Sequence, residues 1–205
     1  MIIVNLEQGS EAWFKEKLGK PSASNISKII CNDGKPSKQR LGYLYELAGE
    51  IITGKQEEGY KNANMELGNE REIESRSYYE LTHNVEVTQV GVIYKDEQKK
   101  FLCSPDGIVS LQNHGLELKN VLPKTQVKYL LDNALPSDYF GQCQMSLYIT
   151  GFDYWQFLSY VPLMKPLLIR VEPDKVYQRA LAIELELFCS KLKEVVAKIR
   201  EENLP

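Results

Sequence analysis

The sequence predicts an α/β fold in which a central mixed β-sheet is flanked by helices. Three observations support this. The first 84 residues contain helix-forming segments with caps and breakers at their ends, the residues from 85 to 119 alternate between apolar and polar as strands do, and helices and strands both follow. That order is typical of a sheet covered by helices. The length of 205 residues fits a single domain, 1–205.

The N-terminal part is expected to be helical. Residues 10–30 form a helical stretch with Ser10 as its N-cap, and Pro21 breaks it so that a second, short helix follows. The N-terminal amides of that short helix would be free to meet an anion. Two more helices are predicted, Gln39–Thr53, which Gly54 ends, and Glu66–Leu81.

After these helices the pattern changes to a period of two, which is typical of β-strands. Valines alternate with polar residues up to Tyr94 and predict one or two strands there. A further strand is expected to begin at Phe101 and to pass through Asp106. Turn-prone residues at 112–115 then predict a hairpin. Such a hairpin would bring Asp106 next to Glu117.

The C-terminal part combines helices, strands and one long helix. Pro136 separates two predicted helices, and Gly151 ends the second of them. Aromatic and β-branched residues predict two strands, and apolar residues at helical spacing from Leu181 to Ile199 predict a long amphipathic helix. In chain order these elements are the helices Lys124–Leu135 and Ser137–Thr150, the strands Tyr154–Pro162 and Leu167–Glu172, and the final helix.

Asp106, Glu117 and Lys119 are the candidate catalytic residues. Residues two apart in a strand point to the same side, so Glu117 and Lys119 project together while Leu116 and Leu118 point into a core. The two carboxylates would converge on one point, and carboxylate oxygens are good ligands for Mg²⁺ or Mn²⁺. A lysine beside a metal-bound water can orient or deprotonate that water. This combination is suited to hydrolysing phosphodiesters.

An ordinary structural explanation of this motif stays open. A Glu-x-Lys pair in a strand is usually a solvated face with a weak ion pair, worth ~0–1 kcal/mol. Ser104-Pro105-Asp106-Gly107 alone is a common turn sequence. The order, the spacing and the apolar strand context favour the catalytic explanation.

Charge is distributed unevenly along the chain. The net charge of −3 argues against a protein that coats nucleic acid generally. Between Lys15 and Arg40, however, seven basic residues stand against two acidic ones, which suits a phosphate backbone guided to one place. Arg40 is therefore a candidate DNA ligand. A lysine-rich solvated face is the alternative explanation of this segment.

Several other classes of protein find no support in the sequence. No apolar run approaches the ~20 residues that span a bilayer, and no signal peptide is recognisable, so we expect a cytoplasmic protein without membrane contact. The four cysteines are far apart and form no Cys-x-x-Cys pair, which predicts reduced thiols without a zinc or iron–sulfur site. His83 and His114 are isolated and are expected to be structural or exposed.

Four blocks of residues stand in a distinctive order along the chain. They are Glu7-Gln8-Gly9 with Trp13, Leu18-Gly19 and Ala23-Ser24; Gly68 with Glu72; Cys103-Ser104-Pro105-Asp106-Gly107 with Gly115-Leu116-Glu117-Leu118-Lys119; and Tyr139 with Gln142-x-Gln144. With these blocks the chain resembles the phage lambda exonuclease-like viral recombinase family, within the PD-(D/E)xK nuclease superfamily. The resemblance covers nearly the whole chain and implies a PD-(D/E)xK, restriction-endonuclease-like core.

The resemblance implies a role for each matched residue. The metal ligands would be Asp106, Glu117 and the Leu118 carbonyl, with Glu72 assisting at a second metal; Lys119 would position the attacking water; Tyr139 and Gln142 would line the site; Lys17, Ser24 and Ser104 would hold a 5′-phosphate; and Met65 would wedge apart the terminal base pairs. The expected cofactor is Mg²⁺, two ions per site, with Mn²⁺ able to substitute. Lys17 departs from the arginine of the family pattern, and lysine lacks the bidentate fork that fits phosphate.

The resemblance also implies an activity and partners. The expected protein is a Mg²⁺-dependent 5′-to-3′ double-strand DNA exonuclease that leaves 3′ single strands for phage-type recombination by strand annealing. It would act at double-stranded DNA ends as a homotrimer ring, with a phage single-strand annealing protein, in the cytoplasm of a host cell. Two alternatives share the motif: a PD-(D/E)xK endonuclease, and a catalytically idle DNA-end-binding protein of the same fold.

Overall fold

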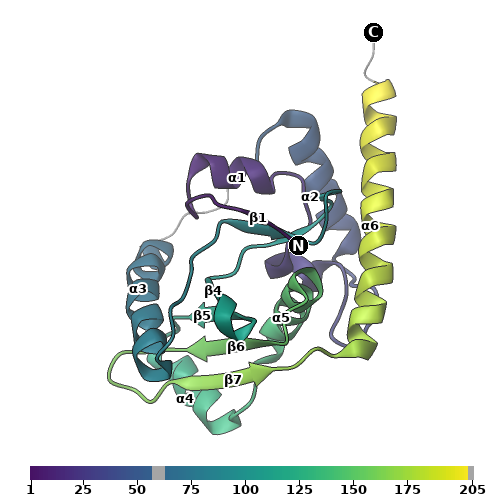
Figure 1. Cartoon of the computed structure of the whole chain (residues 1–205). Coiled ribbons are helices and arrows are strands. Elements are labelled where there is room, and N and C mark those ends of the chain that lie inside the picture. Colours follow the sequence, from purple (N-terminus) through teal and green to yellow (C-terminus); the bar gives the residue numbers. More distant parts are fainter. Residues whose placement is uncertain (57–62, 203–205) are drawn as a thin grey trace.

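The chain folds around two small β-sheets with helices on their outer faces (Figure 1). The computed structural model describes residues 1–56 and 63–202, with the backbone alone for residues 63–70 and 202. Its elements are β1 (Ile2–Val4), α1 (Glu11–Lys17), η1 (Ala23–Lys28), α2 (Arg40–Thr53), α3 (Ala63–His83), β2 (Val92–Tyr94), β3 (Leu102–Cys103), β4 (Gly107–Val109), η2 (Ser110–Gln112), β5 (His114–Lys119), α4 (Pro123–Asp132), α5 (Ser137–Thr150), β6 (Tyr154–Ser159), β7 (Leu167–Val171) and α6 (Lys175–Glu202).

The larger sheet is the predicted central mixed sheet. Its strand order is β4-β5-β6-β7, with β5 parallel to β6 and the two outer pairs antiparallel. Helix α3 packs against one face of β5 through Tyr79, which shares a buried cluster with Leu116 and Leu118. Helix α5 lies against the opposite face. Because both faces of β5 are covered, even its charged residue Glu117 is buried.

The smaller sheet, β1-β2-β3, is antiparallel throughout, and the sequence predicts neither β1 nor a second sheet. The prediction of one strand from Phe101 through Asp106 is wrong, because the segment is divided between the two sheets as β3 and β4. Pro105 lies at the break, where its lack of an N–H ends the ladder of hydrogen bonds.

The strand expected between residues 85 and 94 is shorter than predicted. Only β2 is a strand, and the residues before it form a single bridge, between Thr88 and Ile108. Val87 instead packs into the cluster beneath α3, close to Gly107. The apolar residues of this segment therefore pack into the core without pairing as a continuous β-strand.

The predicted hairpin between β4 and β5 is confirmed. Its turn contains η2 and then Asn113, which has a φ of 51°, a conformation that asparagine tolerates better than most residues. The register pairs Gly107 with Leu116. Asp106 consequently lies opposite Glu117, as the sequence predicts.

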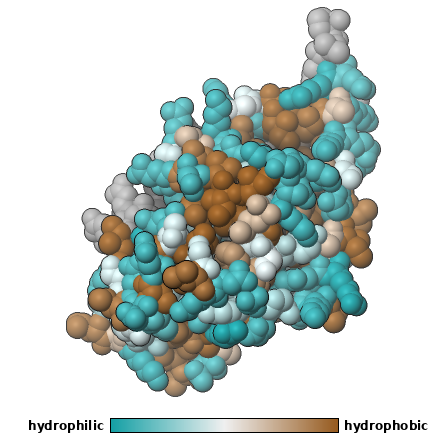
Figure 2. Space-filling model, in the orientation of Figure 1, coloured by the Kyte–Doolittle hydropathy of each residue, from teal (hydrophilic) through white to brown (hydrophobic). Residues whose placement is uncertain are grey.

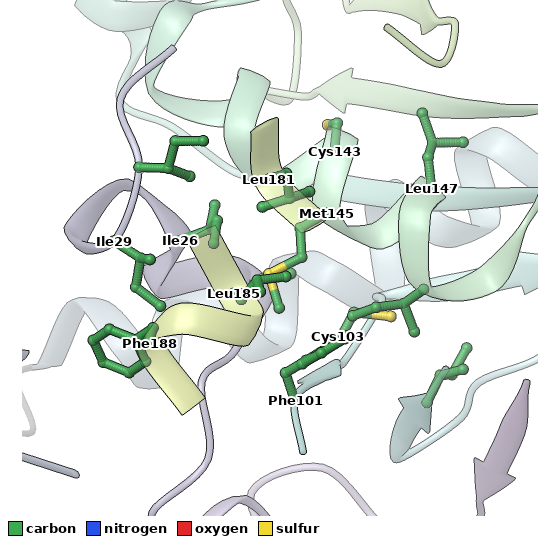
Figure 3. Packing of buried hydrophobic residues seen from close by; sticks show 14 of the residues in the cluster. Ile26, Ile29, Phe101, Cys103, Cys143, Met145, Leu147, Leu181, Leu185 and Phe188 are labelled. Atoms are coloured by element: carbon green, nitrogen blue, oxygen red, sulfur yellow. The ribbon is translucent and has the colours of Figure 1, made fainter. Parts of the chain in front are cut away.

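The main core lies on the α5 side of the larger sheet. Figure 3 shows side chains of η1, β3, α5 and α6 meeting there, among them Ile26, Met145 and Leu185, which are fully buried. The apolar positions predicted for the C-terminal helix face this core and also contact α2. The amphipathic stripe of α6 is thus mainly a packing surface within the chain.

The predicted helices are confirmed, with small shifts at their ends. The Ser10 side chain accepts a hydrogen bond from the Trp13 amide and so caps α1 as expected. Gly54 and Gly151 end α2 and α5 in the left-handed conformation that glycine favours. The short helix after Pro21 is the 3-10 helix η1, and Ser22 makes no side-chain cap to it.

Gly115→Ala is expected to lower the free energy of unfolding by about 1–3 kcal/mol, because overpacking a tight core costs that much. A Cβ at Gly115 would lie 2.2 Å from the ring of Trp155, which is fully buried. Urea denaturation would measure the change. Gly42→Ala is the matched control, since a Cβ there meets no described atom within 4 Å and an alanine favours the helix. Equal stability of the two variants would contradict the packing argument.

Hydrophobic residues also reach the surface between α2 and the upper half of α6. Figure 2 shows them there and at the centre of the same face, surrounded by hydrophilic residues. A cavity of about 330 Å³ lies between α2 and α6, and its apolar lining includes Ile51, Leu192 and Val196. Among the described residues, no helix is both long and apolar enough to cross a membrane.

Candidate active site

Glu117 and Lys119 extend from the same face of β5, as strand alternation predicts. Leu116 and Leu118 point to the opposite face and are buried beneath α3. The ammonium of Lys119 forms an ion pair with Glu117 Oε1, and its Nζ lies 4.0 Å from Asp106 Oδ2. The three predicted catalytic residues are therefore together, with the lysine between two carboxylates.

The electrostatics of this group follow from burial and mutual charge. Burial raises the pKa of the Glu117 carboxyl to about 7, although Lys119 favours its charged form. Burial by itself would lower the pKa of Lys119, but the charges of Glu117 and Asp106 outweigh it and raise the pKa. Lys119 is accordingly held as an ammonium that donates hydrogen bonds.

Asp106 is fixed by the end of the hairpin. Its Oδ2 accepts a hydrogen bond of 2.6 Å from the Leu118 amide, at a point where β4 has ended and offers β5 no further backbone partner. The N–H and C=O of one strand residue point toward the same edge. Lys119, the next residue, turns its carbonyl the other way, to the Tyr160 amide at 2.9 Å. The Leu118 carbonyl consequently faces the same edge as Asp106.

The residues present fit a divalent cation that prefers oxygen. Asp106, Glu117 and the Leu118 carbonyl offer oxygen donors alone, which suit Mg²⁺ or Mn²⁺. No group of three histidine, cysteine, aspartate or glutamate side chains in the described part of the chain could hold a metal by itself. Water and the main-chain carbonyl would therefore complete the coordination, as is usual for Mg²⁺.

Glu72 approaches the site from α3, on the other side of the sheet. Its carboxylate is paired with Arg76, whose Nη2 also lies 3.4 Å from the Asp106 carbonyl oxygen. Burial, followed by the nearby charge of Asp106, raises the pKa of Glu72. Glu72 and Arg76 are four residues apart on one helix, a spacing that by itself predicts no more than a solvated ion pair. In the structure Arg76 is buried, and the burial could not be read from spacing alone.

Helix α5 supplies the two residues expected to line the site. Gln142 Nε2 donates a hydrogen bond of 2.7 Å to Glu117 Oε1. The Lys119 ammonium lies 5.4 Å from the centroid of the Tyr139 ring, within reach of a cation–π interaction. A cleft of about 550 Å³ lies between α4 and the start of α5, and its lining includes Lys124 and Lys128.

Two of the predicted phosphate-binding residues share one cluster. Trp13 Nε1 donates to Ser104 Oγ at 3.0 Å, and Lys17 Nζ lies 3.6 Å from the centroid of the Trp13 ring. Burial lowers the pKa of Lys17 to about 8. The exposed Ser24 is hydrogen-bonded to Ser22 instead, with 3.1 Å between their Oγ atoms.

Two other predicted DNA ligands stand apart from this cluster. Arg40 forms an ion pair with Glu184 and donates a 3.1 Å hydrogen bond to the Glu184 carbonyl, which ties α2 to α6. Its charge is thereby already matched by a neighbour. The side chain of Met65 lies outside the described residues, so its expected wedge role stays a prediction.

Gln142→Leu is expected to move the acid limb of the rate–pH profile to higher pH. The Gln142 hydrogen bond favours the charged form of Glu117, so its loss raises a pKa that is already about 7. A protonated carboxyl cannot bind a cation, and activity would therefore be lost at a higher pH than in the wild type. Initial rates of DNA digestion from pH 6 to 9 at subsaturating Mg²⁺ measure this. Gln178→Leu, on α6, is the control, and equal profiles for all three proteins would contradict the assignment.

Comparisons with known proteins agree with this geometry. A model of the YqaJ-like viral recombinase domain matches residues 12–153. The chain is 28% identical over 169 residues to an uncharacterized protein of Acanthamoeba polyphaga mimivirus; the match covers 77% of the chain but only 30% of that longer protein. The alkaline exonuclease LHK-Exo from Laribacter hongkongensis, also solved with dAMP, has a TM-score of 0.84 at 26% identity, covering 94% of this chain and 97% of the other. A phage related exonuclease from Haemophilus somnus 129PT shares the fold, with a TM-score of 0.67 at 13% identity and coverage of 88% and 96%.

Proposed function

Since the chain belongs to the YqaJ-like viral recombinase domain family, we propose that it is a Mg²⁺-dependent DNA exonuclease acting 5′ to 3′ on duplex ends. The product would be a 3′ single strand for recombination by annealing. The full-length structural likeness to the alkaline exonuclease LHK-Exo supports the nuclease activity.

One observation carries the proposal: the Lys119 ammonium lies between the Asp106 and Glu117 carboxylates, and Gln142 holds Glu117 from α5. A solvated surface pair would not explain this, because Glu117 is only 2% exposed and Lys119 is largely covered as well. Burying two carboxylates together costs free energy unless cations compensate them. The arrangement suits a cation site beside a reacting phosphate.

The chain's own residues would divide the reaction between them. Asp106, Glu117 and the Leu118 carbonyl would hold Mg²⁺, which supplies an activated water and stabilises charge on the phosphate. Lys119, kept as an ammonium by its neighbours, would orient that water and offset the developing negative charge. Gln142 would keep Glu117 ionised and aimed at the cation. A second ion, assisted by Glu72, is part of the proposal.

The polarity and the end requirement can be tested together. Linear duplexes labelled at either 5′ or 3′ ends, each with and without a 5′-phosphate, would be digested with Mg²⁺ and sampled over time. We expect early release of the 5′ label and full resistance of covalently closed circles. Cleavage of the circles would instead indicate an endonuclease, and tight end binding without cleavage in Mg²⁺ or Mn²⁺ would indicate an idle binding protein.

Lys17→Ala tests the phosphate pocket. We expect about a tenfold loss of the preference for a 5′-phosphorylated end, since a partly buried cation contributes 1–3 kcal/mol to such contacts. The comparison is the ratio of initial rates on phosphorylated and unphosphorylated ends. Lys15→Ala, an exposed lysine on the same helix, is the control. An unchanged ratio in Lys17→Ala would remove Lys17 from the pocket.

The assembly and the partner are also proposals. A homotrimer ring would place the basic segment from Lys15 to Arg40 around the DNA, with the acidic remainder of the chain outside. Sedimentation equilibrium would give the mass of the particle directly. A single-strand annealing protein of a phage type would load on the exposed 3′ strand in the host cytoplasm.

A further inference from the structure

Arg76 is a buried cation that joins α3 to the active-site hairpin. It is 8% exposed, and its Nη2 is hydrogen-bonded both to Glu72 Oε1 and, at 3.4 Å, to the Asp106 carbonyl. Its Nε is buried and has no hydrogen-bond partner among the described residues. A guanidinium is costly to bury, so its retention at this place needs a reason beyond the stability of the helix.

The charge balance of the site supplies that reason. Glu72, Asp106 and Glu117 are three carboxylates in one neighbourhood, because Arg76 contacts both the Glu72 carboxylate and the Asp106 main chain and Lys119 lies between Asp106 and Glu117. Without a compensating cation, Glu72 would be repelled from Asp106. Arg76 touches both residues and so holds the helix carboxylate against the strand.

A neighbouring contact shows that this part of α3 is tied to the catalytic strand. Asn120, which directly follows Lys119, lies 3.4 Å from the Oγ of the fully buried Ser75. Ser75 and Arg76 are adjacent on α3, and they reach Asn120, which directly follows β5, and Asp106, which directly precedes β4. The helix is therefore anchored to both ends of the hairpin at the level of the site.

We propose that Arg76 is a positioning residue that sets Glu72 of α3 against Asp106, so that Glu72 can take part in holding a divalent cation. This inference rests on the proposed nuclease function for the reaction that it serves. The guanidinium acts through Glu72 and does not touch the substrate. Lysine at this position would keep the charge but replace the rigid planar guanidinium, whose Nη2 reaches both oxygens, with an ammonium on a flexible stem.

The test is a double-mutant cycle with Arg76→Gln, Glu72→Gln and the double variant, with Arg76→Lys beside them. The first readout is calorimetric titration of each DNA-free protein with Mn²⁺, and the second is the rate of duplex digestion at saturating and subsaturating Mg²⁺. We expect Mn²⁺ affinity to fall about tenfold in Arg76→Gln, within the range for residues that support metal ligands. The double variant should be no weaker than Glu72→Gln alone, and Arg76→Lys should be intermediate.

Two outcomes would overturn the inference. Independent, multiplying losses in the double variant would mean that Arg76 does not act through Glu72. Unchanged or tighter Mn²⁺ binding in Arg76→Gln would mean that Arg76 only competes with the metal cation for the carboxylates or only supports the fold.

Arg71→Gln is the control, because Arg71 lies on the same helix and makes none of the described contacts with the carboxylates. Thermal melts identify variants that do not fold. If Arg76→Gln fails to fold, Arg76→Lys carries the comparison. The Mn²⁺ titration needs no DNA digestion. Failure of the inference can therefore be distinguished from failure of the proposed nuclease function.

Discussion

Lys119→Met is expected to lower the rate of DNA digestion by about 10³-fold or more, the range found when a charge-stabilising donor or an acid–base group is removed. Lys119 is the one cation that touches both strand carboxylates in the described part of the chain, by an ion pair to Glu117 and at 4.0 Å from Asp106. Methionine keeps most of the length of the side chain but removes the ammonium. Single-turnover digestion of a linear duplex at saturating Mg²⁺ measures the loss.

The fold should survive this change. Glu117 would lose its cation, and its pKa, already raised to about 7 by burial, would rise further so that the carboxyl takes up a proton instead of remaining an unpaired buried charge. Lys191→Met is the matched control, because Lys191 is an exposed lysine that pairs with Glu194 on α6. Normal digestion by Lys119→Met, with a normal melting curve, would exclude the proposed mechanism.

Asp106→Asn is expected to reduce digestion by a similar factor, about 10³-fold or more. The amide oxygen of asparagine can still accept the hydrogen bond from the Leu118 amide, which Asp106 Oδ2 accepts at 2.6 Å. The charge that would hold the cation is lost, however, while the shape is kept. Digestion rates and Mn²⁺ titration of the DNA-free protein should both show the loss.

Asp106→Ala separates the chemical role of this residue from its structural role. It removes the acceptor of the Leu118 amide as well as the charge, and leaving such a donor unpaired costs about 1–3 kcal/mol. Asp106→Ala should therefore unfold at lower urea than Asp106→Asn, although both are inactive. Equal stability of the two would show that water replaces the aspartate at the Leu118 amide, and activity in Asp106→Asn would refute its role as a metal ligand.

The sequence predicts an element well where its apolar and polar residues alternate over a long enough stretch, or where local residues mark its ends. Pro136, Gly151 and a run of aromatic residues predict the helix Ser137–Thr150 and the strand beginning at Tyr154 at their observed starts. The strands β1 and β3, of three and two residues, are too short to show an alternation. Their pairing with β2 depends on residues far apart in the chain.

The residues of the site also fall into two groups, those that local sequence predicts and those that only contacts between distant segments bring together. Asp106, Glu117 and Lys119 could be predicted because a hairpin and strand alternation bring them together within one short stretch of chain. The family resemblance added Gln142 and Glu72. It did not indicate that Gln142 bonds Glu117, that Arg76 is buried against Asp106, or that Arg40 is paired with Glu184.

Local sequence is therefore enough to predict which side chains of β5 share a face, since alternation is a property of any extended strand. The order of the longer helices and strands, and hence the larger mixed sheet, could be predicted as well. Which helix residues reach that face depends on how the helices pack on the sheet. The packing of α3 and α5 on opposite sides of the sheet sets how deeply Glu117 and Arg76 are buried, and burial raises the pKa of the Glu117 carboxyl. Such contacts join residues 25 to 144 positions apart, and no local pattern encodes them.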